Sequence, residues 1–553
     1  MERVGTAAET RESAGGSFRP ALFLFGASLA FYAINLDRPE IHDELHHVLA
    51  ARGLLETGEP RIAEGLYWRG YLVTRLVAFS FALFGEGLWS ARLPSVLVAA
   101  LLPPLLFFWV RRAAGPLAAW LAAGLYAVSP FAVEIAQFAR FYALQTLAFT
   151  LAAWAVWSSF CEAATLGGRL ARAAIAFGGL ALAFELQPVT AIGVLGLAAW
   201  AVPALLLRLP DRRSRVLFAI GLVLAGLVFL LFFGEERLRW LWRLYREVPL
   251  FNVPYKDQFW FYYVWYLMLY PTLWTLLAPC TLLALSRAPA LASFAAATFA
   301  VTFLLSSFAG SKGLRYLAYA QPLLFVLWGI GLARVVEHLP ALWQKGRKAL
   351  AEVLAGLGPR ADAAARVLLA AAAVHVLLVN PFWLRTIGLL AAIPIGPEIP
   401  DPDWRRAAAV LRPLLAEVAV VTGTDDLANL YYFGRHDVLY SPTKFHELYD
   451  VVFRDFDRDP RTGRPVIATP AALERVIRCY PSGLFATAEG HWGKRFFVDE
   501  PIIALLERTA ERVPLPPGSH VRAYRWSESS RPSLPAEACR DLPRPRPAGN
   551  PEK

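Results

Sequence analysis

The sequence has few charged residues and few cysteines, and both shortages limit what the chain can be. Only 18% of its 553 residues are charged and 57% are hydrophobic, with a mean hydropathy of +0.43. This composition excludes a soluble globular protein and predicts a polytopic membrane protein with an additional part attached. Of the four cysteines, Cys161 and Cys280 fall in apolar stretches. Only Cys479 and Cys539 could pair in an oxidising compartment, and the sequence leaves that pairing open.

Further absences narrow the functional classes. No Gly-x-Gly-x-x-Gly fingerprint stands at the strand–helix junction around residues 421–426, where Asp425-Asp426 would repel an anion and suit helix capping instead. No inverted repeat or broken, acid-bearing pair of helices is visible, which weighs against a transporter. The net charge of +11 is explained by basic cytoplasmic loops, so it predicts no nucleic-acid partner.

Apolar stretches long enough to cross a bilayer begin at Ala21 and recur to about Leu384. Clusters of Arg and Lys separate alternate stretches, for example Arg111-Arg112 and residues 211–215. The positive-inside rule makes these loops cytoplasmic, together with the N-terminus. We therefore expect an α-helical polytopic protein with about eleven membrane-spanning helices. Their expected ranges are 20–36, 88–110, 116–133, 142–160, 172–187, 189–207, 216–234, 260–284, 289–308, 315–335 and 364–385.

The stretch from Tyr67 to Phe84 is hydrophobic but does not fit this alternation. It contains Arg69 and Arg75, and counting it as a span would place Arg111-Arg112 outside. We expect an interfacial helix on the outer surface, with its arginines at the level of the headgroups. The first outer loop is then unusually long.

Beyond the last span, short strand-like runs such as 438–440 alternate with helical runs such as 470–479. This alternation predicts an α/β domain with a largely parallel sheet, on the outer side because it follows an outward-going span. We expect it to cover the catalytic cavity, to hold none of the catalytic residues, and to serve acceptor recognition or act as a lid. The expected organisation is a disordered cytoplasmic segment (1–19), a transmembrane domain (20–385) with its first outer loop at 37–88, an extracytoplasmic α/β domain (386–526) and a disordered tail (527–553).

An acidic pair, Asp43-Glu44, follows the first span in the sequence Ile41-His42-Asp43-Glu44-Leu45-His46-His47. Carboxylates at the mouth of a bilayer are costly to keep unless they do chemistry, so the pair is a candidate catalytic site. The residues alone leave a second interpretation open, since acidic side chains also favour the start of a helix. The segment resembles the first outer loop of the GT-C glycosyltransferases, which include protein O-mannosyltransferases and lipid A aminoarabinose transferases.

Three other segments resemble the same superfamily. Arg69 stands before Leu83-Phe84-Gly85, where the aminoarabinose transferases carry a Lys that contacts the lipid phosphate, although a snorkelling arginine would look the same. The run from Ser129-Pro130 through Arg140 resembles the Ser-Pro…Ala-Arg-x-Tyr pattern of bacterial relatives of the protein mannosyltransferases. Arg315-Tyr316-Leu317 with Pro322 resembles their Arg-Tyr-Leu-x-x-x-x-Pro segment.

The resemblance implies an inverting GT-C enzyme that moves a sugar from a polyprenyl monophosphate to an acceptor outside the membrane. Asp43 would be the general base, with Glu44 beside it to orient or modulate it. Cationic side chains would hold the donor phosphate, and other side chains would line the cavity. The expected phosphate ligands are Arg69, Arg140, Lys312 and Arg315, and the expected lining residues are Glu134, Tyr142, Tyr316 and His46.

The resemblance leaves the cofactor and the acceptor open. Aminoarabinose transferases carry a second Asp near the position of Tyr142 that helps to bind a metal, and here the nearest acid is Glu134, so a divalent metal remains undecided. The expected partners are a polyprenyl-phosphate-sugar donor, membrane lipids and a glycan, lipid or protein acceptor, with no nucleic acid. The expected location is a bacterial cytoplasmic membrane, with the active site and the α/β domain facing the periplasm.

Two other classes compete with this interpretation. His42-Asp43-x-x-His46 has the histidine spacing of a helical zinc site, so a membrane metalloprotease is one alternative. It lacks the second ligand cluster that such an enzyme needs, because His338 and His375 fall on or near the cytoplasmic side. A lipid or solute transporter is the other, and the long first outer loop and the outer domain favour an enzyme over it.

Overall fold

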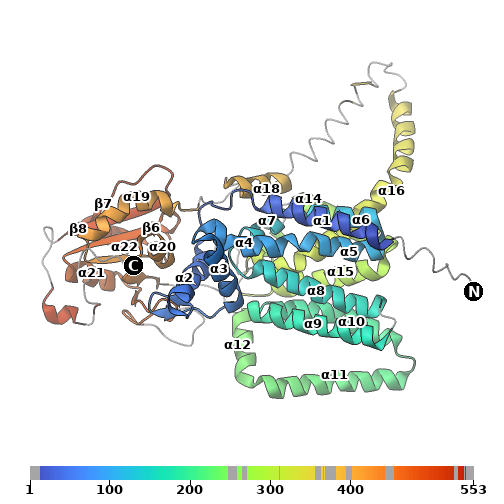
Figure 1. Ribbon diagram of the computed structural model, residues 1–553, viewed down its shortest axis with the longest axis horizontal. Coiled ribbons are helices and arrows are strands. Elements are labelled where there is room, and N and C mark those ends of the chain that lie inside the picture. Colours follow the sequence, from blue (N-terminus) through green and yellow to red (C-terminus); the bar gives the residue numbers. More distant parts are fainter. Residues whose placement is uncertain are drawn as a thin grey trace, which may run out of the picture.

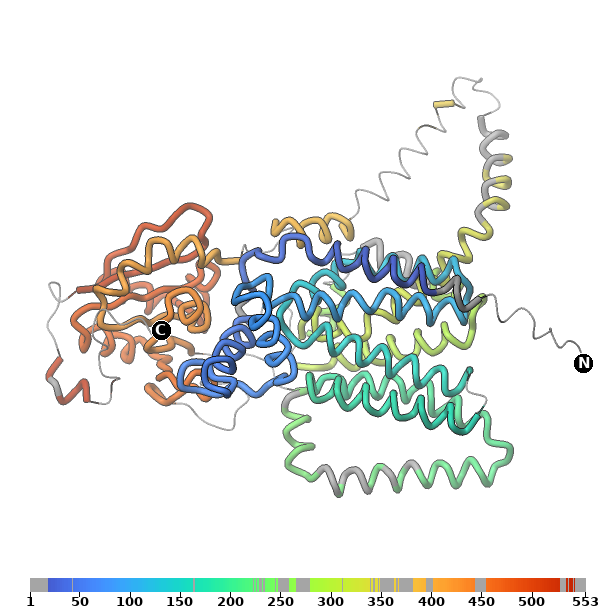
Figure 2. Tube along the Cα trace, in the orientation of Figure 1, coloured from blue at the N-terminus to red at the C-terminus, as the bar shows by residue number. Residues whose placement is uncertain are grey.

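The computed structural model describes residues 13–162, 165–246, 258–264, 271–310, 312–354, 363–364, 367, 381–393, 401–442, 454–527, 534–540 and 542. A bundle of long helices forms one end of the molecule and an α/β domain forms the other (Figure 1). The helices of the first outer loop lie between these two parts (Figures 1 and 2). The candidate site is built where the three meet.

The bundle has the helices that the hydropathy pattern predicts. They are α1 (Ser13–Tyr32), α4 (Leu88–Ala100), α5 (Leu102–Ala114), α6 (Pro116–Ala127), α7 (Pro130–Ala136), α8 (Tyr142–Cys161), α9 (Leu166–Leu186), α10 (Thr190–Arg208), α11 (Arg212–Phe233), α14 (Pro271–Arg287), α15 (Pro289–Ser307) and α16 (Gln321–Leu354). Eight of the eleven predicted spans coincide with one of these helices or with a consecutive pair. The span 315–335 runs from a 3-10 helix, η2 (Leu314–Ala320), into α16, and α14 covers the end of the span 260–284, in which residues 265–270 lie outside the described residues. The last, 364–385, lies mostly outside the described residues, and α18 (Pro381–Ala391) covers its end.

Five described segments are long and apolar enough to cross a membrane by a strict test of length and composition. They are Leu88–Ala114, Tyr142–Cys161, Thr190–Arg208, Pro289–Ser307 and Leu314–His338. A sixth is the pair α6 and α7, which bends by 55° at the break between the two helices. The prediction of a polytopic helical membrane protein is therefore confirmed.

Small residues let the helices approach closely. α16 packs on α6 where Gly329 faces Ala122, and a Cβ added to Gly329 would lie 2.5 Å from the backbone nitrogen of Ala122. Close backbone contact of this kind is typical of packing between membrane helices. The start of α1 and the far half of α16 lie at the end of the bundle remote from the α/β domain (Figure 1). Two of the segments predicted to be cytoplasmic, the described part of the N-terminal segment and the basic part of α16, thus share one end of the bundle (Figure 1).

The first outer loop is folded rather than extended. It contains η1 (His42–Glu44), α2 (Leu45–Thr57), the antiparallel hairpin β1 (Arg61–Ile62) and β2 (Gly65–Leu66), and α3 (Tyr71–Phe84). α2 ends at Gly58, whose φ of +79° lets its N–H return to the carbonyl of Leu54. α3 has 14 residues, about 21 Å of helix, which is too short for a hydrocarbon core of about 30 Å. It lies between the bundle and the α/β domain (Figure 1), and its interfacial position stays a prediction.

The α/β domain, which we call the outer domain after its expected side of the membrane, holds one mixed sheet in the order β5-β4-β3-β6-β8-β7. The strands are β3 (Val420–Gly423), β4 (Val438–Tyr440), β5 (Val466–Ile467), β6 (Ser482–Ala488), β7 (Glu511–Arg512) and β8 (Val521–Ser527), and the helices are α19 (Trp404–Leu414), α20 (Asp426–Phe433), α21 (Pro470–Cys479) and α22 (Glu500–Thr509). The neighbouring strands β5, β4, β3 and β6 pair in parallel, whereas β8 pairs antiparallel with β6 and with β7. The predicted α/β class is therefore confirmed.

Two local predictions in this domain differ in part from the described structure. Asp425 holds the N-cap position of α20, but its side chain makes no capping hydrogen bond. Its Oδ2 instead accepts from the backbone N–H of Ala488 at 2.9 Å, which joins the ends of β3 and β6. Part of the tail expected to be disordered also has a fixed structure, since Ala536–Cys539 forms a 3-10 helix, η7.

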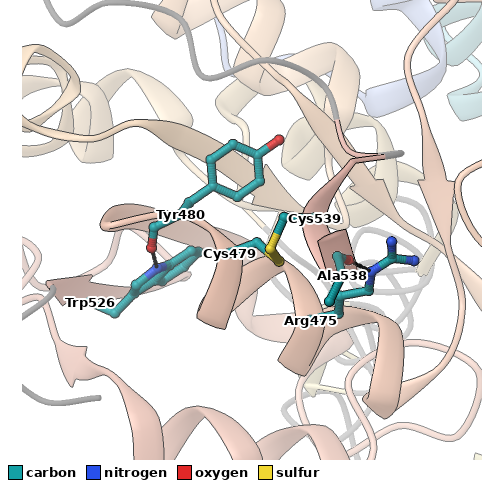
Figure 3. Close-up of a disulfide and its surroundings, with 6 residues drawn as sticks. All are labelled: Arg475, Cys479, Tyr480, Trp526, Ala538 and Cys539. Carbon is teal, nitrogen blue, oxygen red and sulfur yellow. Dashed lines mark hydrogen bonds between the residues drawn. A yellow bond between two sulfur atoms is a disulfide. The ribbon is translucent and has the colours of Figure 1, made fainter. Parts of the chain in front are cut away.

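A disulfide holds η7 against the domain (Figure 3). Cys479, the last residue of α21, is bonded to Cys539 with a Cα–Cα distance of 5.7 Å. Arg475 Nε also donates to the carbonyl of Ala538 at 2.7 Å. The pairing that the sequence left open is therefore present, and it ties part of the tail to the sheet domain.

The outer domain is fastened to the hairpin of the first outer loop. The N–H of Glu64 donates to the carbonyl of Thr462 at 3.1 Å, and Glu64 pairs with Arg464 at 2.8 Å. Gly65 touches the same segment so closely that a Cβ there would lie 2.3 Å from the carbonyl oxygen of Arg461. Only glycine fits at this contact, so the hairpin and the domain are matched in shape.

Candidate functional site

Asp43 lies in η1, directly before α2, and its side chain remains about one-third exposed. Its Oδ2 accepts a hydrogen bond from Arg315 Nη2 at 2.5 Å. Its backbone carbonyl accepts from Arg140 Nη1 at 2.8 Å. Two of the predicted cations, 97 and 272 residues away along the chain, therefore meet at this one acidic residue.

Glu44 is buried, in contrast to its neighbour. Its carboxylate pairs with Arg92 of α4, with Arg92 Nε 3.0 Å from Oε2, and both side chains have no exposed surface. It also accepts from the backbone N–H groups of Ile41 at 2.9 Å and Ala139 at 3.1 Å. These contacts join the loop of Asp43 to α4 and to the segment that carries Arg140. The geometry gives Glu44 the character of a positioning residue.

Aromatic rings hold the guanidinium groups around Asp43. Arg315 lies over the rings of Phe138 and Tyr142, at 5.6 and 5.9 Å from their centroids. Arg140 donates to the hydroxyl of Tyr67 at 3.1 Å. Cation–π contacts and hydrogen bonds restrict each side chain to one orientation, so the cations are preorganised.

Arg69 joins the same group through a shared ring. Arg69 and Arg140 lie over Phe141, at 5.2 and 4.9 Å from its centroid, and Arg69 Nη2 donates to Gln187 Oε1 at 2.8 Å. The pKa of His47 on α2 is held well below its usual value by burial, and then by the positive charges of Arg140 and Arg69. Arg140 and Arg315 thus contact Asp43 directly, and Arg69 shares the ring of Phe141 with Arg140.

The remaining predicted site residues differ in burial and in their contacts. Tyr142 is buried, and Tyr316 and Glu134 are half-buried close to Arg315, with which both interact electrostatically. Lys312 is buried, and its Nζ donates to the carbonyl of Ala309 at 2.5 Å. The place of Lys312 among the phosphate ligands stays a prediction.

His46 connects Asp43 to the outer domain. Its Nδ1 is 3.1 Å from the carbonyl of Asp43, and its Nε2 is 2.8 Å from Nη1 of Arg461. Because a guanidinium only donates, Nε2 must accept, and the proton of a neutral His46 must then lie on Nδ1 and be donated to Asp43. Both ring nitrogens of His46 are therefore engaged by hydrogen bonds, which weighs against a zinc-binding role for His46 and so against the metalloprotease alternative.

Arg461 is held in place by two buried acids of its own domain. Its Nη2 lies 2.7 Å from Asp459 and 3.3 Å from Asp426. Sequence reasoning missed Arg461, since 415 residues separate it from His46 and no motif surrounds it. The outer domain was expected to hold none of the catalytic residues, and through Arg461 it contacts His46 beside Asp43.

The residues around Asp43 do not suit a divalent metal. One carboxylate oxygen is engaged by Arg315, and the surrounding guanidinium groups would repel a cation. No group of three or more His, Cys, Asp or Glu side chains with metal-binding geometry occurs in the part of the chain that the structure describes. The geometry instead suits a phosphate anion next to a carboxylate base.

The fold has solved relatives. ArnT from Cupriavidus metallidurans in its apo state superposes with a TM-score of 0.58 at 16% identity, covering 94% of this chain and 100% of that chain. ArnT bound to undecaprenyl phosphate gives a TM-score of 0.55 at 15% identity, over 93% and 98% of the two chains. The chain therefore shares its fold with ArnT, the lipid A aminoarabinose transferase. The resemblance predicted from four short motifs is thereby confirmed at the level of fold.

A third similar structure is the archaeal oligosaccharyltransferase AglB from Archaeoglobus fulgidus, at a TM-score of 0.47 and 14% identity, over 93% of this chain and 75% of that chain. No protein-family model matches the sequence. No curated protein sequence matches it either.

Proposed function

We propose that the chain is a membrane glycosyltransferase that moves a sugar from a polyprenyl-phosphate donor to an acceptor hydroxyl, with Asp43 as the general base. The observation that carries this proposal is the partly exposed Asp43 carboxylate, which Arg315 contacts directly. Arg140 contacts the backbone carbonyl of Asp43, and Arg69 shares the ring of Phe141 with Arg140. In the proposed reaction the acceptor oxygen attacks the anomeric carbon and its proton passes to Asp43. The bond from that carbon to the phosphate oxygen breaks on the opposite side, so the configuration inverts.

The cations serve the leaving group. When the glycosidic bond breaks, the polyprenyl phosphate gains negative charge, and Arg69, Arg140 and Arg315 stabilise that charge. Lys312 is proposed as a further ligand from the same outer loop as Arg315. Preorganised donors in a site of low dielectric act without the reorganisation that water would need.

The Asp43–Arg315 ion pair adds a substrate-dependent step to this proposal. A carboxylate held by a guanidinium at 2.5 Å is a weak base, because the positive charge stabilises its ionised form. A donor phosphate competes for the same guanidinium and would draw Arg315 away from Asp43. The base then becomes strong only when the donor is bound, which protects an empty site from unproductive proton transfer.

We also propose that the site and the sheet domain face the periplasm of a bacterial cytoplasmic membrane. The Cys479–Cys539 disulfide suits an oxidising compartment. The last turn of α5 carries Arg111 and Arg112. The far half of α16, whose sequence includes Lys345 and Lys348, lies at the end of the bundle remote from the sheet domain (Figure 1), in accordance with the positive-inside rule. The sugar and the acceptor, which is a glycan, a lipid or a protein, are left unspecified.

Binding of undecaprenyl phosphate to the purified protein, measured by native mass spectrometry, tests the phosphate site. Arg69→Ala and Arg140→Ala should each weaken binding at least tenfold, because each removes a charge-assisted hydrogen-bond donor. Arg75→Ala is the matched control, since Arg75 is exposed on α3 and lies over Tyr71. Equal binding by all three variants would contradict the proposed site.

A further inference from the structure

A cleft of about 480 Å³ lies where α2 of the first outer loop meets α19 and α20 of the outer domain. Its polar lining includes Arg52, Glu86, Arg405, Arg412, Tyr431 and Tyr432. The volume falls in the range of about 300–1,000 Å³ that is usual for small-molecule sites. It is formed by residues other than those assigned to the donor phosphate, so it is a separate feature.

The cleft has more positive than negative charge. Arg52 is paired with Glu86, with Nε at 2.9 and 3.0 Å from the two carboxylate oxygens. Arg405 is paired with Asp37 at 2.9 and 3.0 Å. Among the described residues, the contact recorded for Arg412 is its Nε donating to the carbonyl of Tyr432 at 2.5 Å, and no carboxylate pairs with it. Three guanidinium groups therefore border the cleft, whereas two carboxylates, Glu86 and Asp37, pair with them. A third acid, Glu40, is buried at the hydroxyl of Tyr432, and burial raises its pKa to about 7.

This surplus charge indicates the ligand class. The Nη groups of Arg412 can donate to a phosphate or a carboxylate in a fork geometry. Tyr431 also lines the cleft, and its ring, whose centroid lies 5.5 Å from the guanidinium of Arg52, adds an aromatic surface and a hydroxyl to the lining. An aromatic face beside hydrogen-bond donors suits a sugar that carries an acidic group.

The cleft adjoins the loop of Asp43. Arg52 lies two turns into α2, about 10 Å along the helix axis from Leu45, which follows the acidic pair. The hydroxyl of Tyr432 donates to Glu40, three residues before Asp43 in the chain. A glycan of a few units could thus occupy the cleft with one end while its other end reached the base.

We infer that this cleft binds a phosphate- or carboxylate-bearing sugar of the acceptor; the acceptor role rests on the proposed function, whereas the anion-binding role does not. Arg412 is the residue that gives the cleft its preference for an anion. A phospholipid headgroup offers the same phosphate chemistry, so the test must separate the two sources.

The test uses the full-length protein in nanodiscs of phosphatidylcholine, with glucose 1-phosphate, glucuronate and neutral glucose as probes in equilibrium dialysis. We expect the two anionic sugars to bind more tightly than glucose, and Arg412→Gln to weaken their binding at least tenfold. Arg406→Gln is the matched control, because Arg406 lies on the same helix, is 61% exposed and pairs with Asp403. Binding that is equal in Arg412→Gln and Arg406→Gln, or equal for glucose and the anionic sugars, would overturn the inference.

A second arm replaces phosphatidylcholine with phosphatidylglycerol. If the cleft serves the acceptor, the anionic lipid should leave the affinity for glucose 1-phosphate unchanged within twofold. Complete loss of sugar binding in phosphatidylglycerol, restored in phosphatidylcholine, would overturn the acceptor assignment and make a lipid headgroup the occupant. Neither arm requires transfer activity, so a failure of the proposed reaction would be seen separately, in the Asp43 variants.

Discussion

Replacing Arg461 by alanine should separate two properties of the outer domain, its stability and its influence on Asp43. Arg461 joins the buried carboxylates of Asp459 and Asp426 to Nε2 of His46, whose Nδ1 bonds to the carbonyl of Asp43. The variant removes the guanidinium from all three partners. The interface between the outer domain and the first outer loop then lacks the hydrogen bond between Arg461 and His46.

The magnitude follows from burial. Asp459 and Asp426 have almost no exposed side-chain surface, and removing one partner from buried charges costs about 3–5 kcal/mol. His46 also loses the donor that fixes its tautomer, and with it the hydrogen bond to the loop of Asp43. One such bond contributes about 1 kcal/mol, so the transfer rate should fall five- to tenfold.

Thermal unfolding and steady-state transfer by the purified protein measure the two effects. Arg461→Lys keeps a positive charge near both acids but cannot reproduce the fork to His46, so it should recover part of the stability and little of the rate. Arg458→Ala, an exposed arginine in the same segment, is the control and should change neither. An Arg461→Ala protein with normal stability and an unaltered rate would refute the reasoning.

Three other predictions concern buried groups. Glu44→Gln should destabilise the protein by about 3–5 kcal/mol in thermal unfolding, because it leaves Arg92 buried without its counter-charge; a variant as stable as the wild type would contradict this. Burial raises the pKa of Glu40 in the folded protein to about 7. The protonated side chain therefore contributes its full stabilisation below the pKa of Glu40 in the unfolded chain, and this stabilisation is lost as the pH rises through 7. The free energy of unfolding of the wild type should therefore fall by about 3 kcal/mol between pH 4.5 and 8, and that of Glu40→Gln should lack this pH dependence. Equal pH profiles of the two proteins would contradict the prediction. Cys539→Ser should lower stability by about 3–4 kcal/mol, since it opens a loop of 60 residues, and added reductant should then have no further effect.

The sequence predicted the fold well, for a physical reason. The hydrophobic length of each span and the side of each basic loop are set by the bilayer, so apolar runs translate directly into helices such as α8 and α15. The same topology confines the outer loops to one face. Asp43, Arg140 and Arg315 could therefore be expected to lie at one end of the bundle before any contact was known, and the structure brings them together.

The contacts within the site could not be predicted in the same way. Asp43 and Glu44 are adjacent, yet a turn of 3-10 helix points one towards Arg315 and buries the other against Arg92. Arg92 lies inside a predicted span, where hydropathy averaging conceals a single charge. Arg461 comes from a different domain, and no periodicity relates it to His46. Side-chain direction and long-range docking depend on tertiary packing, which local patterns do not specify.

The most direct test of the account is the turnover of Asp43→Asn with a polyprenyl-phosphate-sugar donor in reconstituted membranes. Asparagine keeps the shape of the side chain but cannot accept the proton, and loss of a general base costs about a hundredfold or more. We expect turnover below one-hundredth of the wild-type value, while undecaprenyl phosphate still binds in native mass spectrometry. Glu134→Gln should retain most of the activity as a control for charge loss near Arg315. An Asp43→Asn protein that keeps more than one-tenth of the wild-type turnover would contradict the assignment of Asp43 as the base.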